Sequence, residues 1–171
     1  MRHLHRPGAA RRHAVIGVAA VLVVAGAACG SAPDAGALPG VELSALDGTS
    51  SVRADDISGP AVINLWATWC GPCRTELPAF EAVHVELADQ VRFVGVNQGD
   101  DGAPAAEFLD EVGVTFEQYL DVDGALSDEL SITGLPATVF VARDGSTELH
   151  AGALDEDELL ELIDTYLGIT P

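Results

Sequence analysis

The sequence predicts an α/β domain in which helices flank a central mixed β-sheet. Residues 61–66 form a nearly continuous apolar run, which is typical of a central strand buried on both faces. Strand-like stretches alternate with helix-like stretches, and hairpin signals lie at both ends of this pattern. The chain has 171 residues, of which 48% are hydrophobic, enough to form a core. We therefore expect one folded domain preceded by a leader, and we find no internal repeat.

The first half of the domain begins with a predicted β-hairpin extension. Residues 41–46 and 50–52 flank Asp47-Gly48, a dipeptide that favours a tight turn. The buried strand at 61–66 leads into a predicted helix from Cys70 to about Ala88, where apolar residues recur at helical spacing. A further apolar strand is expected at 91–97.

The second half continues the alternation. We expect helices at 103–112 and 124–130 and strands at 137–141 and 147–150, the last two joined by a turn at Asp144-Gly145. The stretch Asp121–Gly124 superficially resembles a calcium loop, but its glycine comes too early, so we interpret it as a turn and helix cap. Asp155 is expected to cap a final helix that ends near Leu167, with Glu158 completing a capping box.

The amino-terminal segment has the features of an export signal. Residues 1–13 contain four arginines, and fifteen apolar or small residues follow at 14–28, too few to favour a spanning helix. We predict a signal peptide at residues 1–28. Gly26-Ala27-Ala28-Cys29 resembles the lipobox of bacterial lipoproteins, although leucine is usual where Gly26 stands. The resemblance implies lipid on Cys29, a flexible tether over 29–40 and a domain over 41–171, held at the outer face of the cytoplasmic membrane.

Charge excludes some partners of the mature chain. All eight basic residues are arginines, four of them before Cys29, whereas all 27 acidic residues lie after it. The part after Cys29 therefore carries a net charge of −23, which repels nucleic acid and anionic lipid. We expect no nucleic-acid partner.

The segment Trp69-Cys70-Gly71-Pro72-Cys73 carries the chemistry. A C-x-x-C at a strand-to-helix junction places both sulfurs on the first helical turn, where free N–H groups and the helix dipole stabilise a thiolate. Thiolates attack disulfides, so we predict Cys70 as the exposed nucleophile and Cys73 as the resolving cysteine. Pro72 suits a first helical turn, and Trp69 is expected to form an exposed contact surface.

Two other interpretations of this cysteine pair are open. A structural zinc site needs four ligands, but His84 and His150 lie in separate elements, so we expect no metal. A purely structural disulfide would close only a four-residue loop and would constrain the chain little. If Cys29 carries lipid, Cys70 and Cys73 are the only remaining cysteines and form one pair.

Residues 64–78, NLWATWCGPCRTELP, resemble the active-site segment of the thioredoxin superfamily, and in particular its extracytoplasmic TlpA/ResA/CcmG branch. Asn64 stands where cytosolic thioredoxins have a buried aspartate, and Glu76 follows Cys73 by three residues as in the ResA-like branch. Residues 134–141, GLPATVFV, also match the superfamily pattern. The resemblance covers roughly residues 38–168 and implies a thioredoxin-like fold.

The resemblance also implies roles for other residues. It makes the Leu135–Pro136 bond cis and facing the disulfide, so that the backbone of Leu135 can pair with an extended substrate; Trp69, Gly71 and Pro72 would complete the contact surface. Glu76 is expected to raise the pKa of a nearby thiol and to shuttle a proton to or from Cys73. The alternative for Glu76 is an acid that only complements the helix dipole.

These features predict an enzyme that exchanges thiols and disulfides with exported proteins, using the Cys70–Cys73 disulfide and no other cofactor. The resemblance implies the reductive direction, as in cytochrome c maturation, with a membrane redox partner of the CcdA/DsbD type. Alternatives are an oxidant that inserts disulfides, a thiol peroxidase and a non-catalytic binding lipoprotein. We expect a monomer.

Overall fold

The computed structural model describes residues 36–170. The predicted signal peptide and Cys29 lie outside these residues. The strands and helices of residues 36–170 follow in the order β1 Glu42–Ala45, β2 Ser51–Arg53, the 3₁₀ helix η1 Ala54–Asp56, β3 Ala61–Trp66, α1 Gly71–Leu87, β4 Arg92–Gln98, α2 Gly102–Val112, β5 Glu117–Asp121, α3 Ala125–Glu129, β6 Ala137–Val141, β7 Thr147–Ala151 and α4 Glu156–Leu167.

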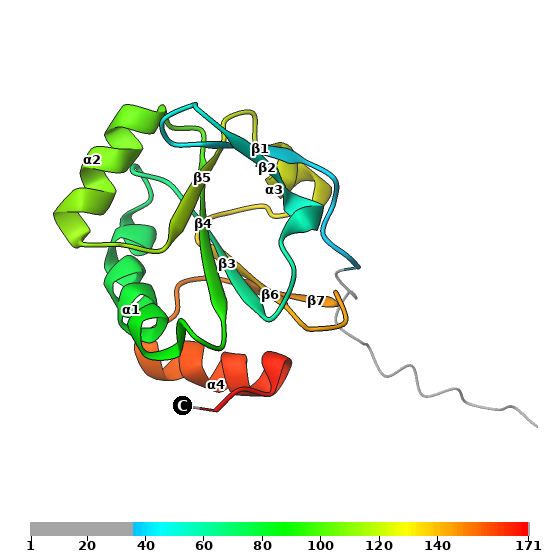
Figure 1. Cartoon of the computed structure of the whole chain (residues 1–171). Coiled ribbons are helices and arrows are strands. Elements are labelled where there is room, and N and C mark those ends of the chain that lie inside the picture. Colours follow the sequence, from blue (N-terminus) through cyan, green and yellow to red (C-terminus); the bar gives the residue numbers. More distant parts are fainter. Residues whose placement is uncertain (1–35, 171) are drawn as a thin grey trace, which may run out of the picture. The chain divides into compact units, whose positions relative to one another are not determined.

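The strands form one mixed sheet in the order β2-β1-β5-β4-β3-β6-β7 (Figure 1). Strands β3, β4 and β5 run parallel to one another, while the remaining pairs are antiparallel. Strand β3 lies between β4 and β6 and is buried along its whole length, as its continuous apolar sequence predicts. The predicted mixed sheet with flanking helices and an N-terminal hairpin is confirmed.

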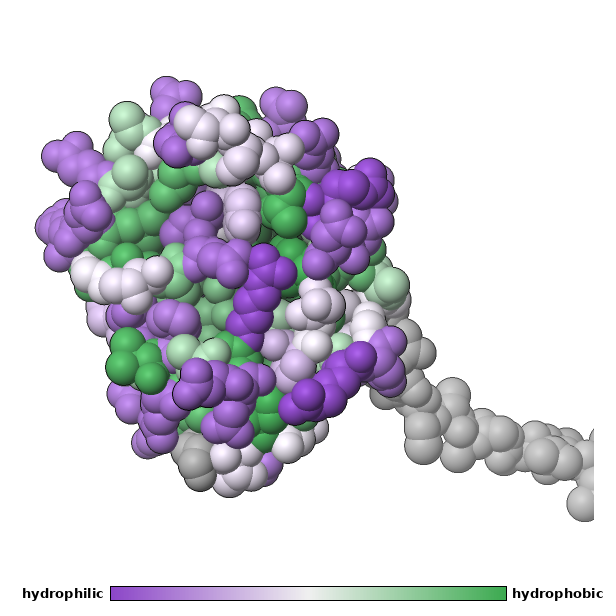
Figure 2. All heavy atoms as spheres, in the orientation of Figure 1, coloured by the Kyte–Doolittle hydropathy of each residue, from purple (hydrophilic) through white to green (hydrophobic). Residues whose placement is uncertain are grey.

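Helices cover both faces of this sheet. On one face α1, α2 and α4 pack against a core that includes Val62, Trp66 and Phe140. On the other face α3 and η1 pack against Ile63, Leu65 and their neighbours. Hydrophilic residues are spread over the face seen in Figure 2, with apolar patches between them. Asn64 points toward the α1 face, because side chains alternate along a strand and both its neighbours belong to the opposite core.

Strand β5 is the one strand that the sequence did not predict. Its burial increases along its length, from exposed Glu117 to buried Leu120 and Asp121, and its first residues are polar. The strand forms because β4 and β1 supply hydrogen-bonding partners on both sides. Gln118 packs over Gly95 of β4 and accepts a hydrogen bond from the indole of Trp66.

The packed structure begins before β1. Leu38, within the predicted tether, is only 7% exposed, and the carbonyl of Gly36 accepts a hydrogen bond from the hydroxyl of Thr147. None of the helices within residues 36–170 combines the length and hydrophobicity needed to span a bilayer.

Candidate active site

The cysteine pair lies where β3 gives way to α1. Cys70 is the N-cap of α1 and is disulfide-bonded to Cys73 in its first turn. The backbone N–H of Cys73 donates to the Sγ of Cys70 over 3.2 Å, so one of the free N–H groups at this helix end is directed at sulfur. This is the contact that would stabilise a thiolate on Cys70 once the disulfide is reduced.

The expected exposure of Cys70 is wrong for this form of the protein. Cys70 is 5% exposed and Cys73 is fully buried, and both pack in the core that contains Trp66 and Phe80. The neighbouring residues are accessible instead: Trp69 is 68% exposed, and Gly71 and Pro72 are exposed as well. Trp66, in contrast, belongs to the core.

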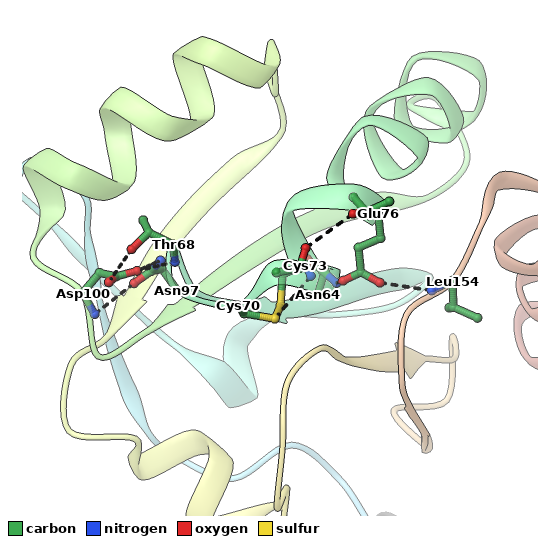
Figure 3. Close-up of a disulfide and its surroundings, with 10 residues drawn as sticks. Asn64, Thr68, Cys70, Cys73, Glu76, Asn97, Asp100 and Leu154 are labelled. Carbon is green, nitrogen blue, oxygen red and sulfur yellow. Dashed lines mark hydrogen bonds between the residues drawn. A yellow bond between two sulfur atoms is a disulfide. The ribbon is translucent and has the colours of Figure 1, made fainter.

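Glu76 lies one turn after Cys73 and is 2% exposed (Figure 3). Its Oε1 accepts a hydrogen bond from Asn64 Nδ2 at 2.8 Å, and its Oε2 accepts one from the backbone N–H of Leu154 at 3.1 Å. Burial raises the pKa of Glu76 from 4.5 to about 7, and the two hydrogen bonds offset only part of that effect. A carboxyl group that is half-ionised at neutral pH can both take up and release a proton.

A second carboxylate holds the loop before Cys70. Asp100 follows β4, and it accepts hydrogen bonds from the backbone N–H of Thr68 at 2.7 Å and from the Thr68 hydroxyl at 2.8 Å. Asn97 Nδ2 donates to the same carboxylate at 2.8 Å. These contacts fix the segment that carries Trp69 to the end of the neighbouring strand (Figure 3). Sequence reasoning did not single out Asp100, Asn97 or Thr68.

One signal in the sequence points to this contact. The parallel strands β3 and β4 end side by side, with Trp66 opposite Asn97. Polar residues that directly follow adjacent parallel strands lie at the same edge of the sheet, so Thr68 and Asp100 were candidates for a contact.

The predicted cis bond between Leu135 and Pro136 is present, and a second cis bond that the sequence analysis did not predict joins Gly59 and Pro60. Pro136 precedes Ala137, which pairs with Leu65 near the end of β3. The loop before β6, which contains Pro136, and the loop after β3, which leads to Cys70, therefore lie at the same end of these two strands. Leu135 is half-buried and Pro136 is buried.

Two clefts adjoin these loops. One of about 400 Å³ is lined by Pro72, Glu76, Leu154 and their neighbours, and it runs between α1 and the start of α4. Another of about 340 Å³ is lined by residues 131–137 together with Leu149, Ala151 and Gly152. Within residues 36–170, no group of three or more His, Cys, Asp or Glu side chains is placed to hold a metal ion.

The fold and the C-x-x-C disulfide together define a thioredoxin-like protein of the thiol–disulfide oxidoreductase class. The chain belongs to the AhpC/TSA family, whose model matches residues 35–149.

Two relatives of the chain are named for thiol–disulfide exchange. Over 113 residues the chain is 34% identical to the thiol-disulfide oxidoreductase ResA of Oceanobacillus iheyensis, a match that covers 64% of this chain and 59% of ResA. It is 32% identical over 138 residues to the thiol:disulfide interchange protein DsbE of Escherichia coli, covering 75% of this chain and 73% of DsbE. The chain thus spans about three fifths of the length of the ResA relative.

A solved structure agrees with this assignment. A secreted disulfide oxidoreductase of Mycobacterium tuberculosis, described as homologous to E. coli DsbE, superposes with a TM-score of 0.67 at 25% identity. The superposition covers 74% of this chain and 96% of that structure. The likeness therefore extends over nearly the whole of a solved domain.

Proposed function

We propose that this protein exchanges dithiols and disulfides with exported proteins at the outer face of the cytoplasmic membrane, in the reductive direction. The observation that carries the proposal is the disulfide at the start of α1, in which the N–H of Cys73 points at Cys70 Sγ and a buried carboxyl group of raised pKa lies one turn further on. The names of the ResA and DsbE relatives support the same chemistry.

The reaction begins with Cys70 as nucleophile. Its thiolate attacks one sulfur of the substrate disulfide, that S–S bond breaks, and the first substrate sulfur leaves as a thiolate that takes up a proton. Cys73 then gives its proton to the carboxylate of Glu76 and attacks Cys70 Sγ. The mixed disulfide breaks, the second substrate sulfur leaves as a thiolate that takes up a proton, and two electrons have passed from the cysteine pair to the substrate, which is now a dithiol.

We expect the substrate to bind where the cysteine loop and the proline loop meet. Exposed Trp69, Gly71 and Pro72 would lie against the substrate on one side, and the Leu135–Pro136 loop would pair with its backbone on the other. A membrane thiol donor of the CcdA/DsbD type would return the pair to the dithiol form. Lipid on Cys29 would keep the enzyme, acting as a monomer, close to that donor.

The test is disulfide reduction with purified protein and insulin as substrate. Cys70→Ser should abolish turnover, and Cys73→Ser should accumulate a mixed disulfide because nothing resolves it. Cys29→Ser is the matched control and should retain full turnover in solution while losing incorporation of labelled palmitate in cells. Turnover that survives Cys70→Ser would exclude the proposed nucleophile.

The direction is tested by the reduction potential of the Cys70–Cys73 pair. The Gly71-Pro72 dipeptide is that of reducing thioredoxin, so we expect a value near that protein's potential of about −270 mV. A value near that of a strong oxidant, about −120 mV, would instead assign disulfide insertion. Rapid reaction of Cys70 with peroxide, without reaction with protein disulfides, would indicate a thiol peroxidase.

A further inference from the structure

Four large apolar side chains are exposed within residues 36–170, and two of them lie at the end of the sheet that carries the disulfide. Trp69 follows β3 and is 68% exposed, and Val122 directly follows β5 and is 57% exposed. The other two lie elsewhere, Val85 on α1 and Tyr166 on α4. Strands β3, β4 and β5 are parallel and adjacent, so the loops that follow β3 and β5 lie at the same end of the sheet.

Hydrogen bonds join the loops that carry these two side chains. The backbone N–H and hydroxyl of Thr68 donate to Asp100 in the loop after β4 (Figure 3). In the same loop, the backbone N–H of Gly99 donates to the carbonyl of Asp121, the residue before Val122. Only β4 separates β3 from β5, so these two strands lie about 10 Å apart. An extended polypeptide covers this distance in about three residues.

Both loops are anchored in the free protein. The Asp121 carboxylate accepts hydrogen bonds from the N–H groups of Leu126 at 3.1 Å and Ser127 at 3.3 Å, which fixes the turn that presents Val122. The hydrogen bonds from Thr68 fix the loop that presents Trp69 in the same way. An exposed apolar side chain gains free energy when a partner covers it, and a chain segment that is already ordered avoids the entropic cost of ordering on binding.

The charge in these loops has one sign. Residues 93–142 contain ten acidic residues and no arginine or lysine. Asp101, after β4, and Asp123, after β5, are both exposed, and neither forms an ion pair within the part of the chain that the structure describes. Arg74, the basic residue on the first turns of α1, lies 4.2 Å from the centre of a phenylalanine ring of α2. The exposed end of the sheet beside Val122 therefore attracts cationic groups.

We propose that Trp69 and Val122, flanked by Asp101 and Asp123, form one docking surface that selects an extended substrate segment with an apolar residue beside basic residues. The substrate cysteine would meet Cys70, and an apolar side chain about three residues away would cover Val122. Lysine or arginine side chains next to it would face the two carboxylates. This inference rests on the proposed function and names the kind of polypeptide that the exchange site accepts, with Val122 as a specificity-determining residue.

The first measurement uses the protein with Cys29→Ser and Cys73→Ser, in which Cys70 is the remaining thiol, and short peptides whose one cysteine is disulfide-bonded to thionitrobenzoate. The Cys70 thiolate attacks the peptide sulfur, the existing S–S bond breaks, and the coloured thionitrobenzoate thiolate leaves, so its absorbance gives the rate. Each peptide has a leucine three residues from its cysteine, on one side or the other, with lysine, serine or glutamate beside the leucine.

At low salt the lysine peptides should react about ten times faster than the glutamate peptides, and added salt should reduce this ratio. Equal rates for the lysine, serine and glutamate peptides would overturn the docking surface and leave the proposed exchange reaction intact. No reaction with any peptide would instead contradict Cys70 as the nucleophile of the proposed function.

The second measurement tests the apolar contact. Val122→Ser should lower the rate with the leucine peptides about threefold, because less apolar surface is buried, and should leave the rate with peptides that carry serine in place of leucine unchanged. Val85→Ser is the matched control, since Val85 is 71% exposed and lies on α1 away from the loops. If the two variants show the same ratio of leucine to serine peptide rates, Val122 does not contact the substrate and the proposal is wrong.

The third measurement separates local charge from the net charge of the chain. Asp101→Asn combined with Asp123→Asn should lower the ratio of lysine to glutamate peptide rates about threefold. Glu86→Gln combined with Asp89→Asn removes the same charge from exposed positions near the end of α1 and should change that ratio far less. Equal changes in the two double variants would show that only the overall charge attracts the peptides, which would refute the docking surface.

Discussion

Two carboxylates lie on either side of the disulfide and receive almost the same donors, yet the protein uses them differently (Figure 3). Glu76 accepts from a backbone N–H and from the amide of Asn64; Asp100 accepts from a backbone N–H and from the amide of Asn97. Asp100 is half-buried and also accepts from the Thr68 hydroxyl, while Glu76 is 2% exposed. Burial, rather than the donor set, raises the pKa of Glu76 to about 7, whereas Asp100 anchors the loop before Cys70.

The largest effect that this comparison predicts is on the pH dependence of stability in Glu76→Gln. The pKa of Glu76 rises from 4.5 to about 7 on folding, so the fold disfavours the ionised form. The preference of the fold for protonated Glu76 contributes its full stabilisation below about pH 4.5. This stabilisation is lost as pH rises through 7, which lowers the free energy of unfolding by roughly 3 kcal/mol. Glu76→Gln has no carboxyl group at this position, so its free energy of unfolding should not show this decline with pH.

Urea unfolding of the oxidised protein at several pH values measures the difference between wild type and Glu76→Gln. That difference cancels the contributions of other titrating groups. If the two stability curves run parallel from acid to neutral pH, Glu76 is not the buried acid that the geometry indicates.

A smaller loss of stability is expected for Asp100→Ala. Its three donors lose their acceptor, which we expect to cost about 2 kcal/mol because the site is partly open to water. Amide hydrogen exchange at Thr68 should become faster, since the loop loses its anchor. The neighbouring Asp101→Ala is the control, because the Asp101 side chain makes no capping hydrogen bond to α2. Stability and exchange at Thr68 that are unchanged in Asp100→Ala would break the comparison.

The smallest effect should come from Asp155→Ala. Asp155 caps α4 in a capping box with Glu158, directly after Leu154, whose N–H donates to Glu76. Loss of the cap should lower stability by about 1 kcal/mol, and Asp155→Ser should restore most of it. Thermal unfolding of the three proteins measures this. Equal stability of the alanine and serine variants would show that the cap does not hold the Leu154 segment.

Much of the site was predictable because its chemistry is local. The cysteines and Glu76 fall within seven residues of one another, and the strand-to-helix junction places them on the first two turns of α1. The turn and helix cap at Asp121–Gly124 were also predicted, and the carboxylate of Asp121 accepts hydrogen bonds from the N–H groups of Leu126 and Ser127. Short spacing makes such contacts readable from sequence.

Contacts between distant segments could not be predicted in the same way. Thr68 and Asp100 are 32 residues apart, and Glu76 and Leu154 are 78 apart. Strand β5 was missed because neighbours on both sides, rather than its own polar start, hold it in the sheet. The low exposure of Cys70 also depends on packing, because Cys70 belongs to a core built from residues that are distant in the chain.

The short hairpin of β1 and β2 has a consequence for how the molecule behaves among its own copies. It covers the side of β5 that would otherwise offer a longer row of unpaired backbone groups, and the outermost strand that replaces it has only three residues. Arg53 at the end of β2 forms an ion pair with Asp55 at 2.9 Å, so this edge of the sheet carries charged side chains. Short, charged edge strands resist edge-to-edge pairing with the sheet of another molecule, so this edge of the sheet disfavours aggregation between copies of the chain.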